Sequence, residues 1–244
     1  APFWGWLAVM LPLEIAAMLL YMTAIRDHPL ALTVPYLAFT PVFVLAVAAW
    51  LLDERVSAQG ALGVLLVTAG AWLLNVRHAR LTRVRSWAAP LAAIFREPGS
   101  RMMLAVALLF AFTGTMGKAV LAYMPPQYFG PFYFVVLGLV MPLVWALPLR
   151  RRAASAPART PLSLRALLRR PRAVAVVAAL NGLMVYTHFI AIARVEVAYM
   201  LAVKRTSLLF GILYGALLFG ETGLRTHLAA GALMVAGVAV ILTS

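Results

Sequence analysis

The chain has 244 residues, of which 64% are hydrophobic and 11% charged, and its mean hydropathy is +0.95. Soluble domains contain roughly 45–50% apolar residues, so this composition excludes a soluble globular protein and predicts an all-α polytopic membrane protein. The formal net charge of +14 does not indicate nucleic-acid binding, because the basic residues are confined to short segments between apolar runs and belong to no recognisable binding module.

Eight apolar segments are candidates for helices that cross a bilayer, since a span needs about 20 apolar residues. Two basic segments, 77–101 and 150–172, interrupt them, and each contains a short apolar stretch that predicts an interfacial helix. In chain order the expected spans are 3–25, 30–52, 57–76, 101–123, 129–149, 172–193, 197–219 and 225–243.

The arginines are distributed very unequally between the two sides of such a bundle. With eight spans, both basic segments and the loops that hold Arg26 and Arg225 fall on one side, which carries sixteen arginines. The opposite side carries Arg55 and Arg194. The positive-inside rule places the arginine-rich side in the cytoplasm and both ends of the bundle outside.

An internal repeat relates the two parts of the chain. A shift of 167 residues aligns 25–54 with 192–221 without a gap, and Glu54 meets Glu221. These glutamates end equivalent helices at opposite membrane faces, so the repeat is inverted, an architecture that places substrate sites near the midplane between the halves. Other matched pairs are Ile25 with Ile192, Ala31 with Ala198, Phe43 with Phe210, Leu51 with Leu218 and Gly70 with Gly237.

The repeat divides the chain into a first half, 1–76, a basic cytoplasmic linker, 77–100, and a second half of five helices, 101–244. Two spans precede the aligned part of the second half and none precedes it in the first. We therefore expect ten spans in an intact parent, of which this chain lacks the first two. A natural eight-span protein is the alternative.

Two segments resemble the closing helix pair of the EamA domain in the drug/metabolite transporter superfamily: 31–75 and 202–242. The resemblance implies an inverted repeat of two EamA-type helical bundles in a protein of the bacterial inner (plasma) membrane that transports a metabolite. The family usually has ten spans and cytoplasmic termini, and this sequence departs from both. The pattern is carried by Thr40, Pro41, Asp53, Glu54, Gly63, Gly70, Ser207, Gly220, Glu221, Gly231 and Gly237.

Lys204 and Arg205 are adjacent cations inside the span 197–219. At the bilayer centre each costs about 2.5–3.5 kcal/mol unless it faces water, a counter-ion or a ligand. Adjacent helical positions point about 100° apart, so we expect one cation to contact substrate while a neighbouring helix braces the other. The structural alternative is a pair with Glu14 or snorkelling to the interface. The pair also resembles one in triose-phosphate and nucleotide-sugar translocators, where it is associated with phosphate binding.

Two further charged residues lie inside the expected spans. Glu14 is equivalent to Asn181 in the repeat, and a buried carboxylate needs a partner or a proton, so an ion pair and proton coupling both remain open. Lys118 either snorkels or extends a polar pathway. Together with Lys204 and Arg205, these charges sum to +2, which favours an anionic ligand bound by charge-assisted hydrogen bonds.

The remaining candidates have both a functional and a structural interpretation. Substrate contacts are expected from Ser207, Tyr199, Tyr214 and His188, although hydroxyl groups also bond their own helix and a lone histidine is often structural. Structural or hinge roles are expected for Pro35, Pro41, Gly211, Gly215, Glu54 and Glu221, because proline disturbs a helix and small residues let helices approach closely.

The sequence predicts a secondary transporter, an exporter, of a small polar or anionic metabolite that works by alternating access. The transport alternatives are a lipid-linked phosphate flippase and an antiporter of the phosphate-ester or nucleotide-sugar type, and the non-transport alternative is a membrane scaffold. No enzyme is expected, because H-E-x-x-H, G-x-S-x-G and a clustered acid pair inside the spans are absent. Cysteine is absent as well, and no metal or cofactor is expected. The expected partners are the substrate and the lipid bilayer.

Overall fold

The computed structural model describes residues 2–28, 33–75, 97–146, 169, 171–207, 209–210 and 224–244. Over these ranges the chain is helical, which confirms the predicted all-α class. The elements in chain order are α1 (Pro2–Asp27), the 3-10 helix η1 (Val34–Phe39), α3 (Thr40–Leu52), α4 (Ala58–Asn75), α6 (Pro98–Val120), α7 (Pro126–Ala146), α9 (Pro171–Ile192), α10 (Val197–Arg205) and α12 (Leu224–Leu242).

The helices begin and end close to the expected spans, but not all of them reach spanning length within the described residues. Two apolar helices, Ala58–Leu73 and Ala229–Leu242, are shorter than a full span. The predicted interfacial helices lie in segments that are largely outside the described residues. The stretches long and apolar enough to cross a membrane are Pro2–Asp27, Val34–Leu52, Pro98–Val120, Pro126–Val144 and Pro171–Ile192.

The contacts divide the chain into two compact units. The first comprises residues 1–120 and 195–244 and therefore contains every described helix except α7 and α9; the second comprises residues 121–194. The predicted halves, 1–76 and 101–244, are defined by the sequence repeat and not by contacts. That division therefore stays a prediction.

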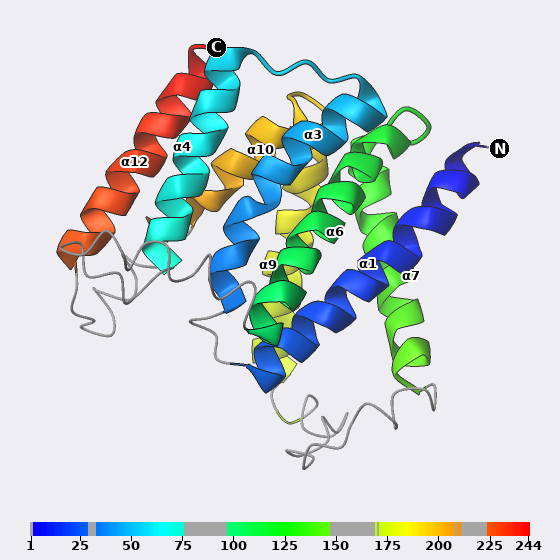
Figure 1. Ribbon diagram of the computed structural model, residues 1–244. Helices are drawn as coiled ribbons and strands as arrows, with labels where there is room; N and C mark the ends of the chain where they lie inside the picture. The colour runs from blue at the N-terminus through cyan, green and yellow to red at the C-terminus, as the bar shows by residue number, and fades with distance from the viewer. Residues whose placement is uncertain are drawn as a thin grey trace. The chain divides into compact units, whose positions relative to one another are not determined.

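Helices α4 and α12 lie side by side in the first unit (Figure 1), and glycines bring their backbones together. A Cβ at Gly70 would meet Ala230 and Met234, and a Cβ at Gly237 would meet Gly63 and Val67. Adding 167 to 63, 67 and 70 gives 230, 234 and 237, so the two sets of contacts exchange under the shift of the sequence repeat. Such reciprocal contacts are the signature of a two-fold relation, here between the closing helices of the two predicted halves.

The two prolines of the second expected span each stand in the first turn of a helix. Pro35 is in the first turn of η1 and Pro41 in the first turn of α3, so the chain changes from a 3-10 to an α-helix at Thr40. A missing amide costs nothing at a helix start, where the donor would have no intrahelical partner. The chain therefore changes helix type within this span, and the structural and pivot roles of Pro35 and Pro41 stay predictions.

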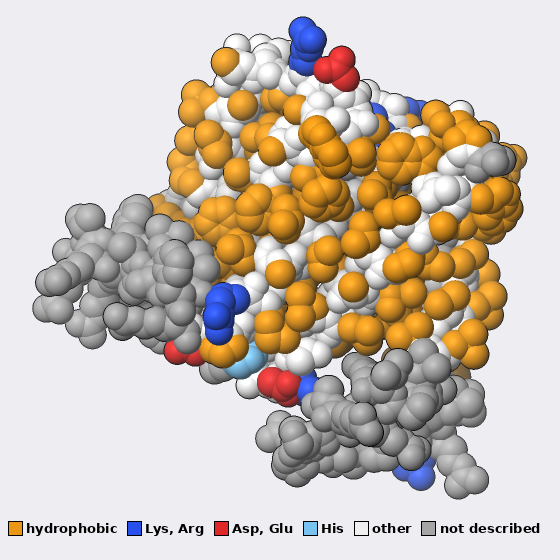
Figure 2. All heavy atoms as spheres, turned by 45° about the vertical axis from the view of Figure 1, so that its right-hand side comes forward, with side chains coloured by type: hydrophobic (Ala, Val, Ile, Leu, Met, Phe, Trp, Pro, Cys, Tyr) orange, Lys and Arg blue, Asp and Glu red, His pale blue; other side chains and the backbone are white. Residues whose placement is uncertain are grey.

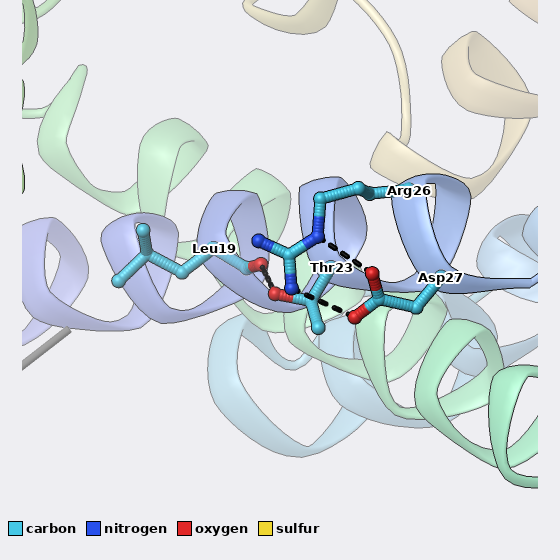
Figure 3. A network of polar contacts seen from close by, with 4 residues as sticks. All are labelled: Leu19, Thr23, Arg26 and Asp27. Atoms are coloured by element: carbon cyan, nitrogen blue, oxygen red, sulfur yellow. Dashed lines mark hydrogen bonds and ion pairs between the residues drawn. The ribbon is translucent and has the colours of Figure 1, made fainter. Parts of the chain in front are cut away.

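Several charged side chains lie at the ends of the helices. On the face in Figure 2, hydrophobic side chains cover most of the described surface and charged ones lie towards its upper and lower margins. At the end of α1, Arg26 donates to Asp27 with an N–O distance of 2.6 Å (Figure 3), and His28 lies against Gly99 at the start of α6. At the other end of α6, Lys118 pairs with Glu54, the neighbour of Arg55. Arg26 and Arg55 therefore lie at opposite ends of α6, as the predicted order of spans requires.

The second unit is an antiparallel pair of apolar helices joined by aromatic contacts. Phe129 of α7 meets Phe189 of α9 edge to face at 5.0 Å and stacks on Tyr133 at 5.7 Å. Gly130 leaves room for the Phe189 ring, since a Cβ there would lie 2.8 Å from it. Most of α9 is exposed, as expected for a helix that meets lipid.

Candidate substrate site

Lys204 and Arg205 form the last turn of α10. The amide of Thr206 donates to the Val203 carbonyl at 3.0 Å, and its hydroxyl donates to the same oxygen at 2.7 Å. These i to i−3 bonds tighten the chain at Thr206, so α10 ends at Arg205, and the chain is helical again at residues 207, 209 and 210. The expected span 197–219 is therefore interrupted at one residue, and its last part, residues 211–219, lies outside the described residues. A helix C-terminus presents carbonyl oxygens and favours cations, which lowers the cost of placing both here.

Arg205 is braced by a neighbouring helix. Its Nη2 donates to Oγ1 of Thr40 at 3.1 Å, and the Thr40 hydroxyl in turn donates to the Leu37 carbonyl at 2.8 Å. Thr40 is only 2% exposed and begins α3, so a change of helix type aims its hydroxyl at the guanidinium. Tyr21 of α1 also lies within electrostatic range of Arg205. One member of the cation pair is therefore held by protein, as the helix geometry predicts.

Lys204 is exposed, whereas Arg205 is half-buried. The carboxyl group of Glu14 on α1 is within electrostatic range of Lys204 and hydrogen-bonds with the hydroxyl of Thr113 on α6. Thr113 is buried and Glu14 half-buried. Four helices therefore contribute to one polar cluster, which we define as Glu14, Thr40, Thr113, Lys204 and Arg205.

Lys118 is not part of this cluster, because it is paired with Glu54. Its Nζ donates to Oε1 of Glu54 at 2.5 Å and to the Val195 carbonyl at 2.6 Å, and the second carboxylate oxygen accepts the Val197 amide at 3.0 Å. Both side chains are largely buried. Since Glu54 neutralises Lys118, the polar cluster keeps Glu14 against two cations, an excess of +1 where the sequence predicted +2.

Tyr199 lies at the end of α10 away from the cations. Its hydroxyl is 3.5 Å from Oγ of Ser57 and 3.3 Å from Oγ of Ser244. A Cβ at Gly60 would collide with its ring and hydroxyl, so glycine is required for this approach. The Tyr199 side chain is thus engaged with the start of α4 and with Ser244, and its predicted contact with substrate stays a prediction.

The other sequence-predicted site residues lie in the second unit, directly after α10 or outside the described residues. Asn181, exposed, and His188, half-buried and edge-on to Phe189 at 5.1 Å, belong to α9 of the second unit and are described only within it. Ser207 is exposed just after α10. Tyr214, Gly211, Gly215 and Glu221 lie outside the described residues. Their substrate and structural roles stay predictions.

Sequence reasoning missed Thr113 and Tyr21 as members of the surroundings of these charges. Thr113 carries a detectable signal, because it is polar within the apolar span 101–123. The pair of Glu54 with Lys118 carries none, because the two residues are 64 positions apart.

Comparison with known proteins identifies a matching family. The EamA-like transporter family matches residues 98–243. The chain is 34% identical over 72 residues to the probable 4-amino-4-deoxy-L-arabinose-phosphoundecaprenol flippase subunit ArnE of Enterobacter sp. (strain 638), a match that covers 30% of this chain and 67% of that protein.

A protein of known crystal structure is also similar, with a TM-score of 0.69 and 18% sequence identity, covering 97% of this chain and 75% of that one. At this identity the likeness shows the fold alone. It nonetheless extends over both compact units and over both predicted halves.

Proposed function

Because the chain belongs to the EamA-like transporter family, an integral membrane family that is not one of enzymes, we propose that it is a secondary transporter of a small anionic metabolite. The observation that carries the proposal is the polar cluster, in which two cations outnumber one carboxylate among apolar helices. Inverted-repeat transporters bind substrate at broken helices near the midplane, and α10 ends at this cluster.

The two cations have different tasks in this proposal. Arg205 is held by Thr40 and gives the site a fixed positive charge. Lys204 is the exposed member, and its ammonium group is the point at which a carboxylate or phosphate oxygen would bind. A charge-assisted hydrogen bond is roughly twice as strong as a neutral one, and a monoanionic group offsets the excess of +1. A cationic substrate would increase the uncompensated charge and is disfavoured.

Glu14 limits which anion the site accepts. Its carboxylate is already within range of Lys204 and bonded with Thr113, so a bound anion has to share the ammonium group with it. Protonation of Glu14 would remove that competition, which makes this residue the candidate for coupling transport to protons.

A lipid-linked phosphate is the second candidate substrate, and the name of the flippase subunit ArnE favours it. A phosphate headgroup would bind the same cations, while its acyl chains would need an opening between helices to the lipid. The two candidates differ in a simple assay: a flippase substrate stays in the membrane, whereas a soluble metabolite appears in the vesicle lumen.

The proposal is tested by ligand-induced thermal stabilisation of the purified protein. We expect inorganic phosphate, glycerol 3-phosphate or succinate to raise the Tm of the wild type, because a ligand that binds the folded state stabilises it by mass action. Lys204→Met should abolish the shift and Lys204→Arg should keep part of it. Arg55→Met is the matched control, since the Arg55 side chain is 89% exposed in a loop. An unchanged ligand shift in Lys204→Met contradicts the proposal.

A further inference from the structure

The start of α10 is held by a junction of three segments, which we call the Glu54 junction and define as Glu54, Lys118, Val195 and Val197. Lys118 comes from the end of α6 and Glu54 from the loop 53–57 after α3. Val195 lies in the turn before α10, and Val197 is the first residue of α10. Its contacts are one ion pair and two hydrogen bonds to backbone. Each of the two side chains also bonds with the backbone at the start of α10: Oε2 of Glu54 accepts from Val197, and Nζ of Lys118 donates to Val195.

The junction holds α10 electrostatically, because a carboxylate at a helix N-terminus interacts favourably with its free amides. Glu54 accepts the amide of Val197, the first residue of α10. The backbone after α3 turns to reach this position: Asp53 has φ 53°, a left-handed conformation in which asparagine and aspartate are the best-tolerated residues after glycine. A left-handed turn at Asp53 thus precedes the carboxylate that caps α10.

Lys118 makes the polar connection between α6 and the start of α10. Helix α10 lies mainly along α3 and α4 and touches α6 only slightly. Nearer the middle of α6, Gly114 lies next to Leu201 of α10: a Cβ added at Gly114 would lie 3.6 Å from the Leu201 side chain, an ordinary van der Waals distance. Because so little apolar surface joins the two helices, they can separate at this end once the ion pair opens.

The junction lies at the first residue of α10, at the membrane face of loop 53–57, and the polar cluster lies at the last turn of the same helix. Lys204 follows Val197 by seven residues, about 10 Å along the helix. At the same face Tyr199 meets Ser57 and Ser244, so the ends of α4, α6, α10 and α12 are all joined there. Along α6 and α10, the Glu54–Lys118 pair and then Leu201 thus come between loop 53–57 and Lys204.

Building on the proposed function, we infer that the Glu54–Lys118 ion pair is a gate: it closes the path along α6 and α10 to Lys204 from the face of loop 53–57, and it opens once in each transport cycle. Alternating access requires an element with two discrete arrangements. A polar junction suits this task because water solvates both charges when the ion pair opens. An apolar contact that opened would expose hydrophobic surface to water, and no hydration energy would offset that cost.

The test measures access to a residue behind the junction, and the chain suits it because it contains no cysteine. The reporter is Leu201→Cys, a half-buried position facing α6 between the junction and Lys204. A second reporter, Arg55→Cys, lies in the exposed loop. Labelling of Arg55→Cys in intact cells and in inside-out vesicles identifies the membrane face of loop 53–57, and a membrane-impermeant maleimide is then applied to Leu201→Cys from that face.

In the Leu201→Cys background we expect Glu54→Gln and Lys118→Met each to speed labelling by about tenfold or more, the factor that corresponds to loss of one charge-assisted hydrogen bond. Asp53→Asn is the matched control: it removes an 88% exposed carboxylate from the same loop, and asparagine tolerates the left-handed backbone. Its rate should equal that of the parent.

Equal rates in all four backgrounds, with Arg55→Cys labelled readily, would overturn the gate. Since Glu54→Gln removes a charge from the helix cap, each variant is first checked for a single gel-filtration peak, and Lys118→Met, which keeps the cap, decides where Glu54→Gln does not fold. No substrate is added, so the result does not depend on whether Lys204 binds an anion.

Discussion

Replacement of Gly237 by alanine tests the packing of α4 on α12. The added Cβ would lie 2.7 Å from the Gly63 carbonyl oxygen and 2.7 Å from the Val67 amide nitrogen. Both distances are shorter than real Cβ contacts, and both partners are backbone atoms, so the helices themselves have to move apart. Overpacking of this kind costs about 1–3 kcal/mol, and we expect the upper half of that range because no flexible side chain can yield.

The same substitution removes glycine from a helix, which by itself stabilises by about 0.8–1.0 kcal/mol. Gly5→Ala in α1 and Gly182→Ala in α9 isolate that effect, since nothing lies within 4 Å of a Cβ at either position. The free energy of unfolding of Gly237→Ala should therefore fall below that of both controls by the full overpacking cost, about 2–3 kcal/mol.

The assay is reversible unfolding of the purified protein in mixed micelles, followed by far-ultraviolet circular dichroism. Gly63→Ala should be as costly as Gly237→Ala, because its Cβ would lie 2.7 Å from the Gly237 carbonyl oxygen. The double variant should cost less than the sum, since both changes separate the same two backbones. The reasoning is refuted if Gly237→Ala and Gly5→Ala change the unfolding free energy alike.

Two further substitutions compare a buried hydroxyl group with an exposed one. Thr40→Val leaves the guanidinium of Arg205 without its 3.1 Å acceptor, so it should lower the unfolding free energy by about 1.5–3 kcal/mol. Thr40→Ser keeps the bond and should keep most of the stability. Equal losses in the two variants would contradict the role given to the hydroxyl. Tyr199→Phe loses only the long contacts of 3.5 and 3.3 Å to Ser57 and Ser244, so its unfolding free energy should stay within about 0.5 kcal/mol of the wild type, and a larger loss would mean that this hydroxyl group contributes more than its geometry indicates.

Hydropathy predicted the helices well because a bilayer imposes one length and one polarity on every span. The bounds of α1, α4, α9 and α12 lie within two residues of the expected segments. The repeat also carried three-dimensional information: the shift of 167 residues predicts which positions of α4 and α12 are equivalent, and their glycine contacts exchange under that shift.

Local polar competition and long-range pairing were harder to predict. The end of α10 at Arg205 depends on the hydroxyl and amide of Thr206 sharing one carbonyl, a choice that an apolar window cannot register. Glu54 was predicted to fix a helix end, and the structure gives it two partners from segments far along the chain. Charges that meet in space leave no trace in a single sequence unless their spacing is helical.

The most direct measurement of the central claim is the uptake of a labelled anion by proteoliposomes containing Lys204→Met, with the anion chosen from those that stabilise the wild type. If Lys204 binds the substrate, uptake falls to the level of empty vesicles, Lys204→Arg retains part of it and Arg55→Met retains all of it, at equal amounts of inserted protein. Uptake by Lys204→Met at the wild-type rate would contradict the account.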